Sequence, residues 1–382
     1  MNKRTILQHA LVVTPREILT DYCVWIEDGR IAQLSPSLPA DTTSWQIHDV
    51  HNAWIIPAWI DLHIHGMGGF GPELGTPQAL LNMSTCLATQ GVGAFCPTLY
   101  CAKPAQMASL LTQLLPAFGK ETGARLIGFH LEGPFISPQK PGVMRPEDIA
   151  PANLKSFQQI YDAAEGKIAI VTLAPEVPGV DDIIDFCIQK NIVVQAGHTN
   201  ATYEQMQTAF DKGVCRVTHF GNAMSGLHQR APGVMGAVLN NPAISCEVIA
   251  DGKHVHPALL ELLRRVKPIS QITAVTDALR PTQQSHGPFL ANAEEVVLAE
   301  GVWKRKSDNV TAGSALTMRE ALSQLLQAGY TFTEATHCTS INAAQLMKLS
   351  TGSIQTGANA DLLVLTKDLR LQQVWLRGTP IL

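Results

Sequence analysis

The stretch WIDLHIHG, residues 59–66, indicates the fold most clearly, because an apolar run here ends in two alternating histidines. Side chains alternate along a β-strand, so His63 and His65 are expected to point to the same face. Neutral imidazole is the commonest nitrogen ligand for zinc, iron and related metals. The pair alone is a weak signal, since two hydrogen-bonded core histidines give the same pattern.

Seven more short apolar runs follow and alternate with stretches that carry helix end signals, such as Thr76-Pro77 before one helix and Pro257 before another. The eight runs are residues 59–65, 93–98, 126–131, 168–173, 192–196, 215–219, 245–249 and 272–276. Eight strand–helix units favour an α/β fold of the (β/α)8, TIM-barrel type, and a large doubly wound sheet is the alternative. The polar residues at the ends of the runs favour the barrel, because barrels keep their chemistry at the carboxyl ends of the strands.

Four of these run ends carry further candidate metal ligands or proton-transfer groups. They are Glu132, His198, His219 and Asp277. Each has an ordinary structural explanation, such as a helix cap or a satisfied core histidine, but one metal site explains all of them together. Two histidines and a glutamate on one divalent ion leave a position for water, whose pKa such an ion lowers. Asp277 is then expected to accept and return a proton.

The composition excludes several classes of protein. The chain has 382 residues, 46% of them hydrophobic and 16% charged, which argues against disorder. Its formal charge of -4 argues against a nucleic-acid-binding protein, and no apolar run is long enough to span a membrane. Eight scattered cysteines without CxxC spacing indicate neither a disulfide framework nor a thiolate zinc site. We therefore expect a cytoplasmic protein.

Both ends of the chain have the alternating pattern of strands and turns. Asp28-Gly29 after an apolar run is a hairpin signal. Neither end is long enough for a comfortable sheet by itself, so we expect the two ends to pair. The predicted domains are a small β-sandwich from residues 1–56 and 351–382, and a catalytic barrel from residues 57–350.

Nine segments, taken in order along nearly the whole chain, resemble the N-acetylglucosamine-6-phosphate deacetylases of the amidohydrolase superfamily. They are PAWIDLHIHGMGG (57–69), IGFHLEGPFISPQKPG (127–142), VTLAPE (171–176), VVQAGHTNAT (193–202), VTHFGNAMSGLHQRAPGVMGA (217–237), VIADGKHVHP (248–257), AVTDAL (274–279), AGSALTM (312–318) and GSIQTGANADLLVL (352–365). The resemblance implies a metal-dependent barrel with a β domain built from both termini. It also implies hydrolysis of the acetamido group of a 6-phosphorylated amino sugar, which yields acetate and the free amine.

The resemblance also assigns roles to individual residues. It implies that Glu132, His198 and His219 are the main metal ligands, that His63 and His65 match a pair for a second ion, and that Asp277 is the catalytic acid and base. Contacts to the sugar phosphate or the amide are implied for Asn222, Ala223, Arg230 and His254. A guanidinium fork suits phosphate oxygens, and His254 is expected to polarise the amide carbonyl. His228 lies in the phosphate loop, which is expected near the interface of a homodimer.

One departure from the family pattern leaves the substrate open. Met144 stands where the family's loop often carries a histidine that contacts the sugar, and a thioether donates no hydrogen bond to a sugar hydroxyl. N-acetylgalactosamine-6-phosphate is therefore an alternative substrate, and another amide is a second alternative. A third is an inactive barrel that serves as an interaction module, although this chain keeps every candidate ligand. One or two divalent ions are expected, zinc first, with iron, manganese or cobalt as other options.

Overall fold

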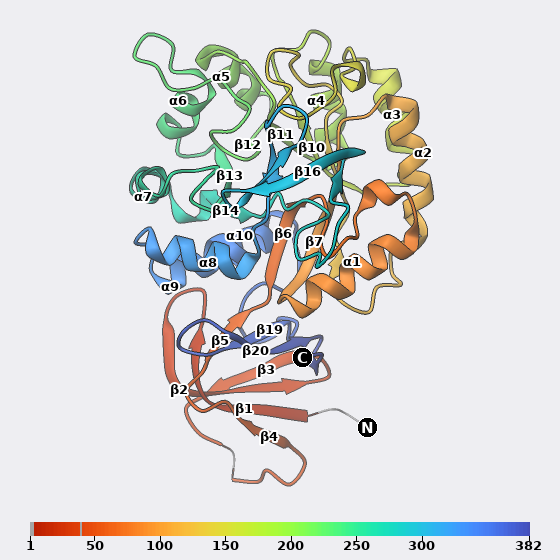
Figure 1. Ribbon diagram of the computed structural model, residues 1–382. Helices are drawn as coiled ribbons and strands as arrows, with labels where there is room; N and C mark the ends of the chain where they lie inside the picture. The colour runs from red at the N-terminus through yellow and green to blue at the C-terminus, as the bar shows by residue number, and fades with distance from the viewer. Residues whose placement is uncertain (1–3, 39) are drawn as a thin grey trace.

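The computed structural model describes residues 4–38 and 40–382, which form a barrel and a sheet built from both chain ends (Figure 1). Residues 1–3 and residue 39, which fall in the predicted β domain of residues 1–56 and 351–382, lie outside the described residues. In Figure 1 the first and the last strands of the described chain lie together in the sheet below the barrel. No helix of the described part is long and apolar enough to cross a membrane.

The barrel wall consists of eight parallel strands within the described residues, one in each predicted run. In spatial order they are β6 (Trp59–Ile64), β7 (Val92–Leu99), β9 (Phe129–Glu132), β10 (Ile168–Leu173), β11 (Val193–Ala196), β12 (Arg216–Val217), β13 (Ser245–Ile249) and β14 (Ile272–Val275), with β8 (Arg125–Leu126) beside β7. The segment after β14 returns to β6, because the Asp277 N–H donates to the His63 carbonyl at 2.8 Å. The barrel prediction is confirmed, and the open doubly wound sheet is excluded.

A helix follows each barrel strand and packs outside the wall. The bounds are α1 (Pro77–Thr89), α2 (Pro104–Leu114), α3 (Leu154–Ala163), α4 (Asp181–Gln189), α5 (Tyr203–Asp211), α6 (Gly233–Asn240), α7 (Pro257–Val266) and α8 (Met318–Gln327). The predicted starts at Pro77 and Pro257 are confirmed, and Thr202 forms a capping box with Gln205 at the start of α5. Such caps satisfy amide groups that the helix leaves free and contribute about 1 kcal/mol each.

Shorter helical segments complete the barrel. They are the 3-10 turns η1 (Pro72–Leu74), η2 (Leu115–Ala117), η3 (Pro146–Asp148) and η4 (Ile269–Gln271), the helices α9 (Phe332–Thr336) and α10 (Asn342–Leu346), and the π-helical η5 (His337–Ile341) between these two. The Asn342 side chain donates to the Ile269 and Ile272 carbonyls at 2.7 Å, which ties α10 to the start of β14.

The two ends of the chain pair in one sheet, as predicted. Its strands are β1 (Arg4–Val13), β2 (Ile18–Glu27), β3 (Arg30–Ser35), β4 (Gln46–Asp49), β5 (Trp54–Pro57), β19 (Leu362–Leu365), β20 (Leu371–Leu376) and β21 (Thr379–Pro380). Antiparallel pairing of β5 with β19 joins the ends, and the Asp28-Gly29 hairpin turn has positive φ at both residues. The first half of β1 pairs with β4 and the second half with β5, and the pairing of β1 with β2 shifts register on both sides of Ala10. The sheet has a core of its own that includes Leu7, Ile55 and Trp375.

A small sheet inserted between β14 and α8 was not predicted from the sequence. Its strands are β15 (Leu290–Ala291), β16 (Glu294–Ala299), β17 (Val302–Arg305) and β18 (Thr311–Ser314). It is joined to the barrel end by hydrogen bonds of Ser314, whose N–H donates to the Asp277 carbonyl at 3.0 Å. The inserted sheet therefore borders the mouth of the barrel.

Candidate active site

Six predicted side chains meet at the carboxyl ends of the barrel strands. His63 lies in β6 and His65 directly follows it, while Glu132 is the last residue of β9. His198, His219 and Asp277 each lie two residues beyond the ends of β11, β12 and β14. These last three have φ values of 47°, 30° and 50°, a backbone region that is uncommon for residues other than glycine. Such conformations often occur at functional sites, where the surrounding structure holds them.

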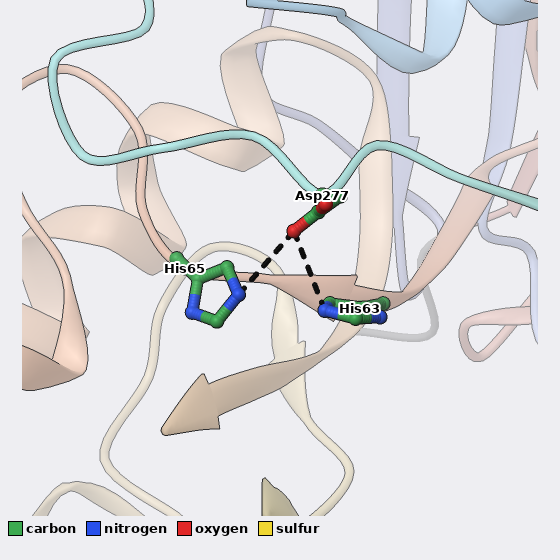
Figure 2. A group of neighbouring side chains, drawn as sticks. All are labelled: His63, His65 and Asp277. Carbon is green, nitrogen blue, oxygen red and sulfur yellow. Dashed lines mark ion pairs between the residues drawn. The ribbon is translucent and has the colours of Figure 1, made fainter. Parts of the chain in front are cut away.

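The six residues form two clusters of three buried groups, each compact enough to hold a metal ion. In the first, Glu132 Oε1 lies 3.1 Å from both His198 Nε2 and His219 Nε2. In the second, Asp277 Oδ1 lies 3.3 Å from both His63 Nε2 and His65 Nε2. Figure 2 shows Asp277 pointing toward both rings, with dashed lines for these two ion pairs. Glu132 Oε2 also lies 3.2 Å from His65 Nε2, so the Glu132 carboxylate lies between the two clusters.

The other ring nitrogens of three histidines face acceptors. His198 Nδ1 lies 2.9 Å from the Lys140 carbonyl, and His65 Nδ1 lies 3.2 Å from the Thr98 carbonyl. His63 Nδ1 lies 3.3 Å from Glu247 Oε2. A neutral imidazole has one N–H, and these contacts place it on Nδ1 in each ring.

The three Nε2 atoms are then lone-pair acceptors that face carboxylate oxygens, an arrangement that favours a cation between them. His63 Nε2 is buried and has no hydrogen-bond partner within the described part of the chain. Nδ1–H donation to a carbonyl or carboxylate is also how metal-ligating histidines are usually oriented. The residues therefore fit a divalent metal centre, and the donor set of imidazole and carboxylate suits zinc, iron or manganese.

The environment of Asp277 holds it as a carboxylate, which is the form that can accept a proton. Burial is the largest single effect and raises the pKa of Asp277, but in the metal-free protein the charge of a protonated His63 and a hydrogen bond from a protonated His65 together outweigh burial and lower this pKa. Burial would likewise raise the pKa of Glu132, but the charge of His63 and the hydrogen bonds from His198 and His219 outweigh burial and hold this pKa well below its usual range. Both groups are therefore anionic near neutral pH.

A cavity of about 230 Å³ opens in front of the two clusters. Its walls include Asn222, Ala223 and His254, three of the residues predicted to contact substrate. Arg230 and His228 are exposed in the loop before α6. Within the described part of the chain, neither of them lines this cavity. The structure thus brings the metal-ligand candidates, Asp277, Asn222, Ala223 and His254 together, and it leaves Arg230 and His228 outside.

His254 is held in the cavity wall by Asp251, which the sequence analysis did not single out. The Asp251 carboxylate lies 2.6 Å from His254 Nδ1 and also accepts the His254 N–H at 2.8 Å. Burial alone would lower the pKa of His254, but the hydrogen bond and charge of Asp251 outweigh burial and raise it. Asp251 therefore fixes which ring nitrogen of His254 is free to face a ligand.

Three more residues of the site were missed. Glu247 supports His63 from within β13, and a carboxylate inside an apolar strand was a signal for it. Tyr100 stacks on His65 with ring centroids 3.8 Å apart and planes inclined by 6°. Thr311 reaches the cavity from the inserted sheet. Neither Tyr100 nor Thr311 belongs to a recognisable sequence motif, so their positions in the site could be found only from the tertiary structure.

Met144 lines the cavity and is 3% exposed. It packs in an apolar cluster with Tyr100, Val296 and Trp303. The wall at Met144 is therefore apolar and offers a substrate packing contact without a hydrogen-bond donor.

A barrel with two histidine–carboxylate clusters at its strand ends is typical of metal-dependent hydrolases. Comparisons with known proteins identify the family within this class. Residues 54–381 match the model of the amidohydrolase family. The N-acetylgalactosamine-6-phosphate deacetylase of Escherichia coli O157:H7 is 31% identical, over 98% of each chain. The N-acetylglucosamine-6-phosphate deacetylase of Bacillus subtilis is also 31% identical, over 99% of this chain and 97% of the relative.

The fold of the whole chain is shared with solved deacetylase structures. The N-acetyl-D-glucosamine-6-phosphate deacetylase of Mycobacterium smegmatis, as a mutant in complex with N-acetyl-D-glucosamine-6-phosphate, superposes with a TM-score of 0.92 at 26% identity and full coverage of both chains. The Thermotoga maritima enzyme superposes with a TM-score of 0.88 at 27% identity, over 99% of each chain. The chain therefore belongs to the amidohydrolase family and, within it, to the N-acetylglucosamine-6-phosphate deacetylase family, which confirms the resemblance found in the sequence.

Proposed function

We propose that this protein hydrolyses the acetamido group of N-acetylglucosamine-6-phosphate to give glucosamine-6-phosphate and acetate. The observation that carries the proposal is the pair of buried histidine–carboxylate clusters, joined by Glu132 and opening into one cavity. The relatives named above and the ligand of the Mycobacterium smegmatis complex support the phosphorylated amino sugar as substrate. The inactive-barrel alternative fits poorly, because every candidate ligand is present and in place.

The metal ligands in this proposal are Glu132, His198 and His219, with His63 and His65 as the pair for a second ion. A divalent cation held there supplies Lewis acidity, which activates water and polarises a carbonyl. Zinc is our first choice, because it binds readily to imidazole and carboxylate donors, and iron, manganese or cobalt are other options. The identity and number of the ions, a homodimeric assembly and a cytoplasmic location stay predictions.

Asp277 and His254 perform the remaining chemistry in the proposal. Asp277 Oδ1 takes the proton of the attacking water and passes it to the nitrogen of the leaving amino sugar. The amine leaves poorly unless it is protonated, so this second transfer matters as much as the first. His254, with Nδ1 held by Asp251, presents Nε2 to the amide carbonyl and stabilises the charge that develops on its oxygen.

N-acetylgalactosamine-6-phosphate is the second candidate substrate. It is favoured by the apolar wall at Met144 and by the 31% identity to the Escherichia coli N-acetylgalactosamine-6-phosphate deacetylase. The two sugars differ in the orientation of one hydroxyl, and a thioether wall does not form the hydrogen bond that would select one orientation.

Acetate release tests the proposal directly. The two phosphorylated N-acetyl sugars and their unphosphorylated forms are assayed in parallel with metal-loaded protein. We expect turnover of at least one phosphorylated sugar with a kcat/KM far above that of its unphosphorylated form. Absence of acetate release from both phosphorylated sugars would contradict the proposal and favour another amide substrate.

A further inference from the structure

A second cavity, of about 290 Å³, lies beside the cavity of the candidate active site. Tyr100 is the only residue of the described chain that lines both spaces, so it forms part of the wall between them. The walls of the second cavity come from the segments that follow β6, β7, β9 and β14, and from α2 and the inserted sheet. This space is therefore distinct from the one in front of the metal-ligand clusters.

Two arginines line the second cavity, and each uses one edge of its guanidinium group within the protein. Arg145 Nε donates to Asp148 Oδ2 at 2.7 Å. Arg280 Nε lies 2.5 Å from Glu73 Oε1 and donates to the Leu290 carbonyl at 3.2 Å. The terminal nitrogens of both guanidinium groups form no hydrogen bond within residues 4–38 and 40–382. These nitrogens are donors that a bound molecule can use.

Two further polar groups at this cavity are buried and have no hydrogen-bond partner within the described chain. They are Nδ2 of Asn292 and the hydroxyl of Tyr100. The backbone beside the first is fixed, because the Asn292 N–H donates to Glu73 Oε2 at 2.5 Å. An unpaired buried donor is costly, so both groups favour a ligand that brings acceptor oxygens.

The charges around this cavity nearly balance. Each guanidinium group is paired with one carboxylate, Arg145 with Asp148 and Arg280 with Glu73. A ligand with one negative charge can therefore use the free donors, whereas a dianion would be repelled by both carboxylates. The rest of the wall is apolar apart from one thiol and consists of Leu74, Leu99, Cys101, Ala102, Leu110 and Ala293.

We propose that this second cavity binds a monocarboxylate with a short apolar chain. The planar fork of a guanidinium group matches the two oxygens of a carboxylate, and Asn292 Nδ2 supplies a further donor. The leucine side chains cover the apolar chain, and the volume leaves room for several carbons. The bound molecule contacts Tyr100, whose ring stacks on His65 on the side of the metal-ligand clusters. The proposal goes beyond the deacetylase function and does not depend on it.

The test measures the binding of acetate, butyrate and hexanoate to metal-loaded protein by calorimetry. We expect binding to tighten about fourfold for each methylene that the cavity covers. Arg145→Lys and Arg280→Lys keep the ion pairs but remove the fork, so each should raise the Kd for butyrate about tenfold. Leu110→Trp, at a half-buried position, should fill the cavity and weaken butyrate binding at least as much. Arg264→Lys is the matched control, because Arg264 Nε pairs with Glu334 at 2.9 Å outside the cavity.

None of these variants changes a residue of the metal-ligand clusters, so carboxylate binding at a metal ion is common to all of them. Equal butyrate affinity in the parent protein and in all variants would overturn the inference. So would inorganic phosphate that binds more tightly than butyrate and is lost in the same variants, because that result would indicate a dianion site. If the arginine variants fail to fold, Leu110→Trp decides alone. The measurement needs no turnover, so a failure of the deacetylase assay would leave this result unaffected.

Discussion

Asp277 has the contacts of a proton carrier. Its Oδ1 faces two histidine nitrogens at 3.3 Å, and its backbone N–H is bonded to the His63 carbonyl. The position of the carboxylate is therefore fixed from both strands at the barrel seam, while its charge remains available to a reacting group.

Replacing Asp277 by asparagine keeps the shape and removes the base. We expect Asp277→Asn to fold, to keep the metal bound at Glu132, His198 and His219, and to lose about 10²–10⁴-fold in kcat, the usual contribution of positioned proton transfer. Steady-state kinetics on metal-replete protein check this. A near-normal kcat would show that Asp277 only braces the end of its strand, since asparagine caps well.

Asp251 and His254 predict a pH dependence. Because Asp251 raises the folded-state pKa of His254 above its ordinary value near 6.5, the pair adds stability that is fully present below that ordinary value. This stability is lost as pH rises through the folded-state pKa, where the imidazole becomes neutral. Asp251→Asn should lower the pKa of His254 in an NMR titration. An unchanged pKa would mean that Asp251 does not control the charge of His254.

Among the strands, β6 and β14 are tied together by one buried carboxylate. Asp61 Oδ2 accepts the Thr276 hydroxyl at 2.5 Å, and Asp61 Oδ1 accepts the Thr276 N–H at 3.2 Å. The same oxygen accepts the His63 N–H at 3.3 Å. This network closes the barrel directly beneath the second histidine–carboxylate cluster.

Asp61→Ala should therefore destabilise the barrel by about 1–3 kcal/mol, because buried donors lose their acceptor. Urea unfolding followed by circular dichroism measures the change as a lower midpoint. Asp185→Ala on the exposed side of α4 is the control, and it should stay within about 0.5 kcal/mol of the parent. Equal midpoints for the two variants would mean that the Asp61 network does not stabilise the seam.

The strands and helices were predictable where local sequence dictates them. Continuous apolar runs indicated the eight buried barrel strands, and end signals such as Thr76-Pro77 marked helix starts. The inserted sheet was missed because β16 and β17 have charged residues at many positions and resemble a solvated loop. Tyr100 was missed because its role arises from stacking on His65, which no local pattern indicates, whereas Glu247, beside His63, was missed although a carboxylate inside an apolar strand was a signal for it.

The sequence indicated which strand-end residues would meet in the two clusters, but it did not indicate where Arg230 would lie. Ligands at strand ends are placed by the barrel itself, so Glu132 and His219 could be located from the run ends alone. Arg230 lies in a loop whose path no periodicity specifies, and the structure leaves it exposed. The domain division at residues 56/57 and 350/351 stays a prediction, although the strands from both ends share a sheet.

For the chain as a whole, metal binding should stabilise the fold. The clusters place lone-pair nitrogens against carboxylates, so an ion that binds the folded state alone shifts the unfolding equilibrium. At a hundredfold excess over its Kd, the ion should add about 2.7 kcal/mol. Calorimetry of chelator-treated protein should show a Tm that rises with added zinc. The Tm of Glu132→Gln should rise less with added zinc than the Tm of the parent protein. A Tm that does not change with added metal would argue against a metal centre in the native fold.

A metal ion held by Glu132, His198 and His219 is expected to make this barrel a metal-dependent sugar deacetylase. The most direct measurement is acetate release from N-acetylglucosamine-6-phosphate and N-acetylgalactosamine-6-phosphate by chelator-treated protein titrated with Zn²⁺, Fe²⁺ or Mn²⁺. We predict no release before metal is added, and a rise that saturates at one or two ions per chain with at least one of the sugars. Undiminished release from metal-free protein, or none at any metal loading with either sugar, would contradict the claim.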